Sequence, residues 1–130
     1  MQIIHSRIMK TYDHEGSLRR MGDDPELFQE MVGLLRSDAP PLLDALHEAH
    51  KAGDAVRMHR AAHTLKGLAS NFGAERAVAA AAEAERLAKA NQSAGLPAAI
   101  RELEEAIAEL IGALTPSTPT APNLEMSRSR

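Results

Sequence analysis

The chain contains no cysteine. This absence excludes disulfide bonds, catalysis by a thiol and zinc sites built on cysteine. It also fits a protein of the reducing cytoplasm, so we expect a cytoplasmic location.

Long apolar runs are missing as well. No segment approaches the ~20 apolar residues of a membrane-spanning helix. The N-terminus has only a short apolar trio before charged residues, which does not form the core of a signal peptide. We therefore expect a soluble protein that does not enter membranes, and the Met1 start and the C-terminal tail favour a free-standing one.

Neither sign of charge dominates the sequence. The 15 basic and 18 acidic residues leave a formal net charge of −3. A general nucleic-acid-binding surface needs an excess of basic residues, so we expect no nucleic-acid partner. An ATP-binding motif is also absent, which argues against an autonomous kinase on this chain.

The sequence contains one helical pattern after another, and no segment alternates as a β-strand does. We predict an all-α protein, an antiparallel up-down four-helix bundle with a short extra N-terminal helix. We assign this bundle to residues 11–114. Residues 1–10 are expected to be a loose N-terminus, and residues 115–130 a disordered tail rich in Pro, Ser and Thr.

Capping residues set the expected boundaries of the first helices. A short helix is expected over residues 13–21. Asp24 followed by Pro25 predicts the start of the next helix, because Asp caps helices well and Pro suits their first position. The expected apolar face of that helix consists of Leu27, Phe28, Met31, Leu34 and Leu35.

Two consecutive prolines, Pro40 and Pro41, interrupt the apolar pattern. Proline ordinarily breaks a helix interior, so we expect a new helix capped by Asp38 and ending at Gly53. Its apolar residues are Leu42, Leu43, Leu46 and Ala49.

The remaining boundaries follow from the same signals. Asp54 is expected to cap a further helix, which ends in a sharp turn at Gly73. An alanine-rich helix is expected over residues 74–90, and its small side chains would let it lie close to its neighbours. The last helix carries a regular apolar stripe of Ile100, Leu103, Ile107, Leu110 and Leu114.

The helix after Asp54 divides into two faces. Its apolar stripe consists of Met58, Ala62, Leu65, Ala69 and Phe72. At ~100° per residue, His63 falls roughly 130° from the middle of that stripe and should point at water. The residues within about 60° of His63 on the helical wheel are His59, Lys66, Gly67 and Ser70.

This polar face suits a histidine that carries a phosphoryl group. Such a group brings nearly two negative charges, and Lys66, one turn after His63, can supply a mobile positive charge to it. Gly67 costs about 1 kcal/mol relative to Ala in a helix interior. A bare backbone at this position would let the loops of another protein approach His63 closely.

With these features the sequence resembles the histidine-containing phosphotransfer (HPt) domain of bacterial two-component phosphorelays. The resemblance covers roughly residues 12–112. The residues that carry it are Ala62-His63-Thr64-Leu65-Lys66-Gly67, Gly73-Ala74, Leu87, Asp24-Pro25-Glu26-Leu27, Asp38-Ala39-Pro40 and Ala52-Gly53-Asp54.

The resemblance implies a phosphorelay intermediate rather than an enzyme. His63 would be phosphorylated on its outer ring nitrogen, with Lys66 and Gly67 beside it. The inner nitrogen would be oriented by Glu85 on the next helix, or by Glu83 if the register differs. The implied partners are response-regulator receiver domains and a sensor or hybrid histidine kinase. The receiver would bring Mg²⁺, and this chain would bind no cofactor of its own.

Docking to such partners is expected around His63. The candidate docking residues are Val56, His59, Arg60 and Ser70, and Arg76 is a further candidate. We expect a monomer, because the apolar stripes of the helices are used by the bundle's own core.

Two alternatives remain open from the sequence. The pairs His59–His63 and His47–His50 have spacings that can chelate one metal ion, although the HExxH pattern is absent and nearby basic residues disfavour a cation. The chain could instead be a helical adaptor that is not phosphorylated, in which case replacing His63 would leave partner binding and signalling intact.

Overall fold

The computed structural model describes residues 11–115, and all the regular structure in this part of the chain is helical. The helices are α2 (His14–Arg20), α3 (Pro25–Ala52), α4 (Ala55–Ser70), α5 (Glu75–Lys89), the 3-10 turn η1 (Ser93–Gly95) and α6 (Leu96–Leu114). The predicted all-α bundle is confirmed. The predicted loose N-terminus and nearly all of the predicted tail lie outside the described residues.

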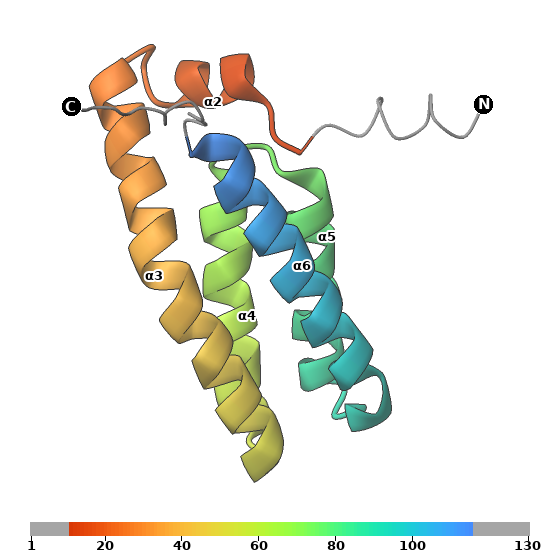
Figure 1. Cartoon of the computed structure of the whole chain (residues 1–130). Helices are drawn as coiled ribbons and strands as arrows, with labels where there is room; N and C mark the ends of the chain where they lie inside the picture. The colour runs from red at the N-terminus through yellow and green to blue at the C-terminus, as the bar shows by residue number, and fades with distance from the viewer. Residues whose placement is uncertain (1–10, 116–130) are drawn as a thin grey trace, which may run out of the picture.

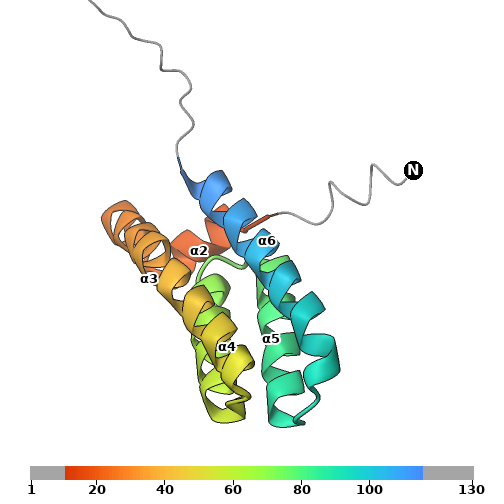
Figure 2. The same cartoon turned by 60° about the horizontal axis from the view of Figure 1, so that its bottom comes forward.

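Four long helices lie side by side and run alternately up and down (Figure 1). Each packs against the next in the chain, and α6 closes the bundle by also contacting α3. Figure 2, which views the bundle from another side, shows the same arrangement with α2 across one end. None of the helices in the described segment is both long and apolar enough to cross a membrane.

The core is one continuous cluster contributed by all the long helices. The predicted stripe of α6 is confirmed, since all five of its residues are buried. Phe28 of α3 meets Phe72 edge-to-face at a centroid distance of 5.7 Å and joins the end of α4 to the core. The predicted face of α3 is partly wrong, because Leu27 and Leu34 are 36% and 46% exposed.

The prediction of two helices on either side of Pro40-Pro41 is wrong, because α3 runs through both prolines. Asp38 does not cap a helix there; its carboxylate accepts a hydrogen bond from the Ser37 hydroxyl at 3.2 Å. The carbonyls deprived of an amide partner belong to Arg36 and Ser37, which are exposed and open to water. Buried residues before and after the prolines, including Leu35 and Leu46, press both halves against the same core. Tertiary packing therefore outweighs the local cost of the prolines.

The predicted helix starts at Asp24 and Asp54 are confirmed. Asp24 accepts from the amides of Glu26 and Leu27 at 3.0 and 3.2 Å, and Asp54 from that of Arg57 at 3.1 Å. The predicted turns at Gly53 and Gly73 are confirmed too, with φ values of 67° and 60°. These are left-handed conformations, which glycine adopts without a steric penalty.

Helix α2 closes the end of the bundle at which α4 turns into α5. The amide of Asp13 donates to the carbonyl of Phe72 at 2.8 Å, and the Asp13 side chain accepts from the amide of Gly16. A Cβ atom on Gly73 would lie 2.9 Å from Cβ of Asp13, so this turn leaves no room for a side chain. The close approach fixes the C-terminal end of α4, the helix that carries His63.

Candidate functional site

The exposed face of α4 carries the candidate histidine. The inner stripe of α4 is buried as predicted, with Met58 the most exposed of its five residues at 4%. His63 lies on the opposite face with its side chain 64% exposed. The amphipathic pattern of α4 therefore holds the ring at the surface while the helix backbone stays anchored in the core.

The ring of His63 is held by a residue from the neighbouring helix. The Nδ1 atom of His63 lies 2.7 Å from Oε2 of Glu85 on α5. The buried residues of α5 are mostly alanines, so α5 lies close enough to α4 for a glutamate to span the gap. A carboxylate can only accept, so Nδ1 carries the hydrogen and the lone pair of the neutral ring is on the outer nitrogen, Nε2.

Glu85 binds a second cationic side chain through its other oxygen. Its Oε1 lies 2.7 Å from Nζ of Lys66, and its side chain is only 15% exposed. The hydrogen bond from Lys66, assisted by that from His63, holds the pKa of Glu85 below its ordinary value and outweighs the opposing effect of burial. Glu85 is therefore a carboxylate at neutral pH.

His59 completes this group of side chains. It stands one turn before His63 on α4, and its Nε2 lies 3.2 Å from the same Oε2 of Glu85. The two imidazole rings are nearly parallel, with an interplanar angle of 8° and centroids 6.1 Å apart. Sequence periodicity placed His59 near His63 but gave no sign that both rings converge on one carboxylate oxygen.

The alternative orienting residue, Glu83, lies elsewhere. Its carboxylate binds the guanidinium of Arg86 on the same helix, at 3.0 and 2.7 Å. The hydrogen bond from Arg86 holds the pKa of Glu83 below its usual range. Of the two glutamates considered from sequence, Glu85 is thus the one that contacts the His63 ring.

Gly67 leaves open space beside His63. A Cβ atom built on it would meet nothing within 4 Å, so no neighbouring helix of this chain requires a glycine here. The Ser70 hydroxyl one turn later donates to the carbonyl of Gly67 at 2.9 Å rather than to the His63 ring. Gly67 is exposed, so its backbone is accessible to another molecule.

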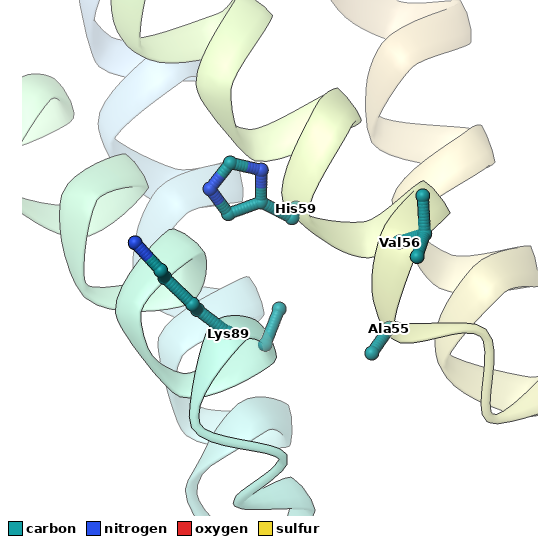
Figure 3. A pocket seen from close by; sticks show the side chains of 5 residues that line it. Ala55, Val56, His59 and Lys89 are labelled. Carbon is teal, nitrogen blue, oxygen red and sulfur yellow. The ribbon is translucent and has the colours of Figure 1, made fainter.

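An apolar depression lies next to this group of side chains, between the start of α4 and the end of α5. It has a volume of about 350 Å³ and is lined by Ala55, Val56, His59, Ala88 and Lys89. Figure 3 shows the His59 ring extending from α4 toward α5, with Lys89 on the α5 side and Ala55 and Val56 on the α4 side. Val56 is 66% exposed, the largest exposure of a bulky apolar side chain in the described part of the chain.

The two arginines considered for docking differ in their surroundings. Arg60 lines a second depression, between α3 and α4. Arg76 is instead bound to three glutamates of α6, namely Glu102, Glu105 and Glu109 at 2.7, 3.2 and 3.1 Å. The hydrogen bonds that Arg76 donates to Glu102 and Glu109 raise its pKa, chiefly that to Glu102. Its guanidinium therefore joins α5 to α6, and its part in docking stays a prediction.

One histidine away from this site also contacts a carboxylate. His47 on α3 contacts Glu104 on α6 at 2.5 Å. Between residues 11 and 115, no group of three or more His, Asp or Glu side chains is arranged to hold a metal ion. At the His63 site, the position that a cation would take beside Glu85 is occupied by the Lys66 ammonium group.

The sequence was compared with models of known protein families. Residues 30–113 match the family model of the Hpt domain. The chain belongs to the Hpt family. The matched region includes all of α4 and α5, and with them His63, Lys66, Gly67 and Glu85.

This Hpt domain is similar to a solved structure over most of the length of both chains. That structure is the crystal structure of histidine-containing phosphotransfer protein B (HptB) from Pseudomonas aeruginosa PAO1, with a TM-score of 0.73 and 25% sequence identity. The match covers 79% of this chain and 90% of that chain. No curated protein matches the chain by sequence.

Proposed function

We propose that this Hpt domain is a phosphorelay intermediate that accepts a phosphoryl group on His63 from a receiver-domain aspartate, or from a histidine kinase, and passes it to another receiver-domain aspartate. The observation that carries this proposal is the hydrogen bond between Nδ1 of the exposed His63 and the Glu85 carboxylate, at 2.7 Å. It leaves the lone pair of the neutral ring on Nε2, the nitrogen that can attack phosphorus.

The transfer step needs no proton movement. Nε2 of His63 attacks the phosphorus of the aspartyl phosphate, and an N–P bond forms as the P–O bond to the aspartate breaks. The aspartate leaves as a carboxylate with the bonding electron pair, and Nδ1 keeps its hydrogen. The ring gains positive charge during this step, and the carboxylate of Glu85, already 2.7 Å from Nδ1, stabilises that charge. The return to a second aspartate is the same step in reverse.

Lys66 is proposed to stabilise the transferred group. Its ammonium is bound to Oε1 of Glu85, one turn from His63 and 33% exposed. The flexible stem of a lysine lets the charge swing toward phosphoryl oxygens on Nε2, where a charge-assisted contact contributes about 1.5–3 kcal/mol before screening. The two glutamate contacts thus hold both the nucleophile and the cation close to the point of attack.

The surface around His63 is proposed as the docking area for the receiver. Val56 and the apolar depression beside it offer apolar contact, and the open backbone at Gly67 lets partner loops approach. His59, Arg60 and Ser70 border this area. We expect a transient encounter that buries less than about 1,200 Å². The receiver is proposed to bring Mg²⁺ and an acidic pocket, while this chain, a cytoplasmic monomer, acts as a carrier without a cofactor of its own.

The proposal is tested by phosphoryl transfer from a pre-phosphorylated receiver to the wild-type protein and to the His63→Gln variant. We expect label on the wild type only, lost in acid and stable in alkali. His47→Gln is the matched control, because His47 also contacts a glutamate on another helix but lies between α3 and α6. Label retained on His63→Gln, or lost from His47→Gln alone, would refute the assignment to His63. If no receiver of a panel transferred phosphate to the wild type or to either variant, the result would favour a helical adaptor that is not phosphorylated.

A further inference from the structure

His59 has a position that docking alone does not explain. Its side chain is only 39% exposed, against 64% for His63, and its Nε2 lies 3.2 Å from the Glu85 oxygen that holds the His63 ring. This distance is at the long end of the range for an N–H···O hydrogen bond. We infer that His59 is a positioning residue that steadies the Glu85 carboxylate for His63, an inference that rests on the proposed phosphotransfer.

The need for such a residue follows from the two oxygens of Glu85. Oε1 is bound by Lys66, and Oε2 by His63. The terminal torsion of a glutamate is broad, so a carboxylate held through one oxygen turns easily. When Lys66 swings to the phosphoryl group, Oε1 loses its partner, and Glu85 then depends on what holds Oε2.

His59 is suited to hold that oxygen. It comes from the same helix as His63, one turn away, and the two rings are within 8° of parallel. Both nitrogens that face Oε2 therefore come from one rigid element, and their spacing does not depend on loop motion.

The arrangement requires opposite tautomers on the two rings. An ionised carboxylate accepts but cannot donate, so Glu85 needs hydrogen on Nδ1 of His63 and on Nε2 of His59. The first tautomer leaves Nε2 of His63 free to attack, whereas the second makes His59 a donor and not a competing nucleophile at that nitrogen. The same oxygen thus distinguishes the reacting histidine from its neighbour.

The first test replaces the donor and keeps the helix. His59→Leu removes the N–H group, and His59→Gln retains an N–H at a similar reach; both residues are good helix formers. We expect His59→Leu to slow transfer at saturating receiver concentration by about 3- to 10-fold, the value of one hydrogen bond, and His59→Gln to restore most of the rate. A pure docking role would instead raise the receiver concentration needed for half-maximal rate.

The second test measures the His63 tautomer directly, by nitrogen–proton correlation NMR of the unphosphorylated protein. We expect Nδ1–H on His63 and Nε2–H on His59 in the wild type. With Lys66 also replaced by Ala, which frees Oε1 as in the transfer step, His59→Leu should shift the His63 population toward the Nε2–H tautomer, whereas His59→Gln and the control His47→Leu should leave it unchanged.

The outcomes separate this inference from the proposed function. A wild-type rate and an unchanged His63 tautomer in His59→Leu would overturn the role of His59, and so would a His59→Gln variant as slow as His59→Leu. Failure of the wild-type protein to accept phosphate would refute the proposed function, while the tautomer measurement would still decide whether His59 positions Glu85.

Discussion

Removing the carboxylate of Glu85 is the most informative perturbation of this protein. In the Glu85→Ala variant His63 loses its partner on Nδ1, Lys66 loses its partner at 2.7 Å, and His59 loses its neighbour at 3.2 Å. The ring is then free to turn and to place its hydrogen on Nε2, which removes the nucleophilic lone pair from the exposed side. We expect slower transfer with the fold retained.

The size of the loss in transfer rate follows from the hydrogen bond between His63 and Glu85. A hydrogen bond that involves an ionised group contributes about 1.5–3 kcal/mol, and each 1.36 kcal/mol is tenfold in rate, so the Glu85→Ala variant should transfer about 10- to 150-fold more slowly. Glu85→Gln should lose less, because its one carbonyl oxygen can still accept from His63, although the amide nitrogen that replaces the other oxygen cannot accept from Lys66. The expected order of rates is wild type, then Gln, then Ala.

The assay is a single-turnover transfer from a phosphorylated receiver, followed by rapid quench. Glu83→Gln is the matched control, since Glu83 stands two residues earlier on α5 but pairs with Arg86. It should transfer at the wild-type rate. If Glu85→Ala were as fast as the wild type, or if Glu83→Gln were equally slow, the argument that one carboxylate orients the His63 ring would be wrong.

Four further predictions concern other parts of the protein. Gly67→Gln should raise the free energy of unfolding by about 0.5–1 kcal/mol and yet abolish receiver binding. Gly33→Gln is the control, because a Cβ atom at Gly33 also meets no neighbour; it should raise the free energy of unfolding without affecting receiver binding. Urea denaturation measures the stability of both variants, and a titration with receiver measures their binding. Lys66→Ala should accelerate hydrolysis of the phosphohistidine while leaving measurable transfer, and an unchanged lifetime would contradict its role. Arg76→Ala should lower the free energy of unfolding by about 1 kcal/mol without changing transfer at saturating receiver concentration, because its guanidinium joins α5 to α6. The pKa of Glu85 is lowered in the folded protein, so the Glu85 carboxylate stabilises the fold at neutral pH. This stabilisation is lost as the pH falls below 4.5, the ordinary pKa of a glutamate. The difference in unfolding free energy between wild type and Glu85→Gln should therefore shrink between pH 7 and about pH 3.

Helix ends were predicted well where the determinants are local. Asp24 and Asp54 accept from amides two or three residues ahead, and Gly53 and Gly73 take positive φ within single turns. Such contacts need only the few residues around them, so the sequence contains their full explanation.

The misjudged segment is α3, where a local rule competed with packing. Prolines at positions 40 and 41 favour a break, but the break would expose Leu35 or Leu46, which are fully buried. The same reasoning applies to Leu27 and Leu34, whose periodicity indicated burial although both are exposed. Neither outcome could be judged without knowing which faces meet.

The sequence by itself determined the helical class, the helix ends at Asp24, Gly53, Asp54 and Gly73, and the exposure of His63, because these depend on periodicity and on contacts within a few residues. The resemblance to the HPt domain also implied that the residue orienting the His63 ring is Glu83 or Glu85. Only the tertiary structure decided between them, paired Lys66 with Glu85, placed His59 against the same oxygen and tied Arg76 to α6. The physical reason is that each of these contacts joins residues of two different helices. Their existence depends on the axial register and distance between α4, α5 and α6, which the packing of the whole core sets.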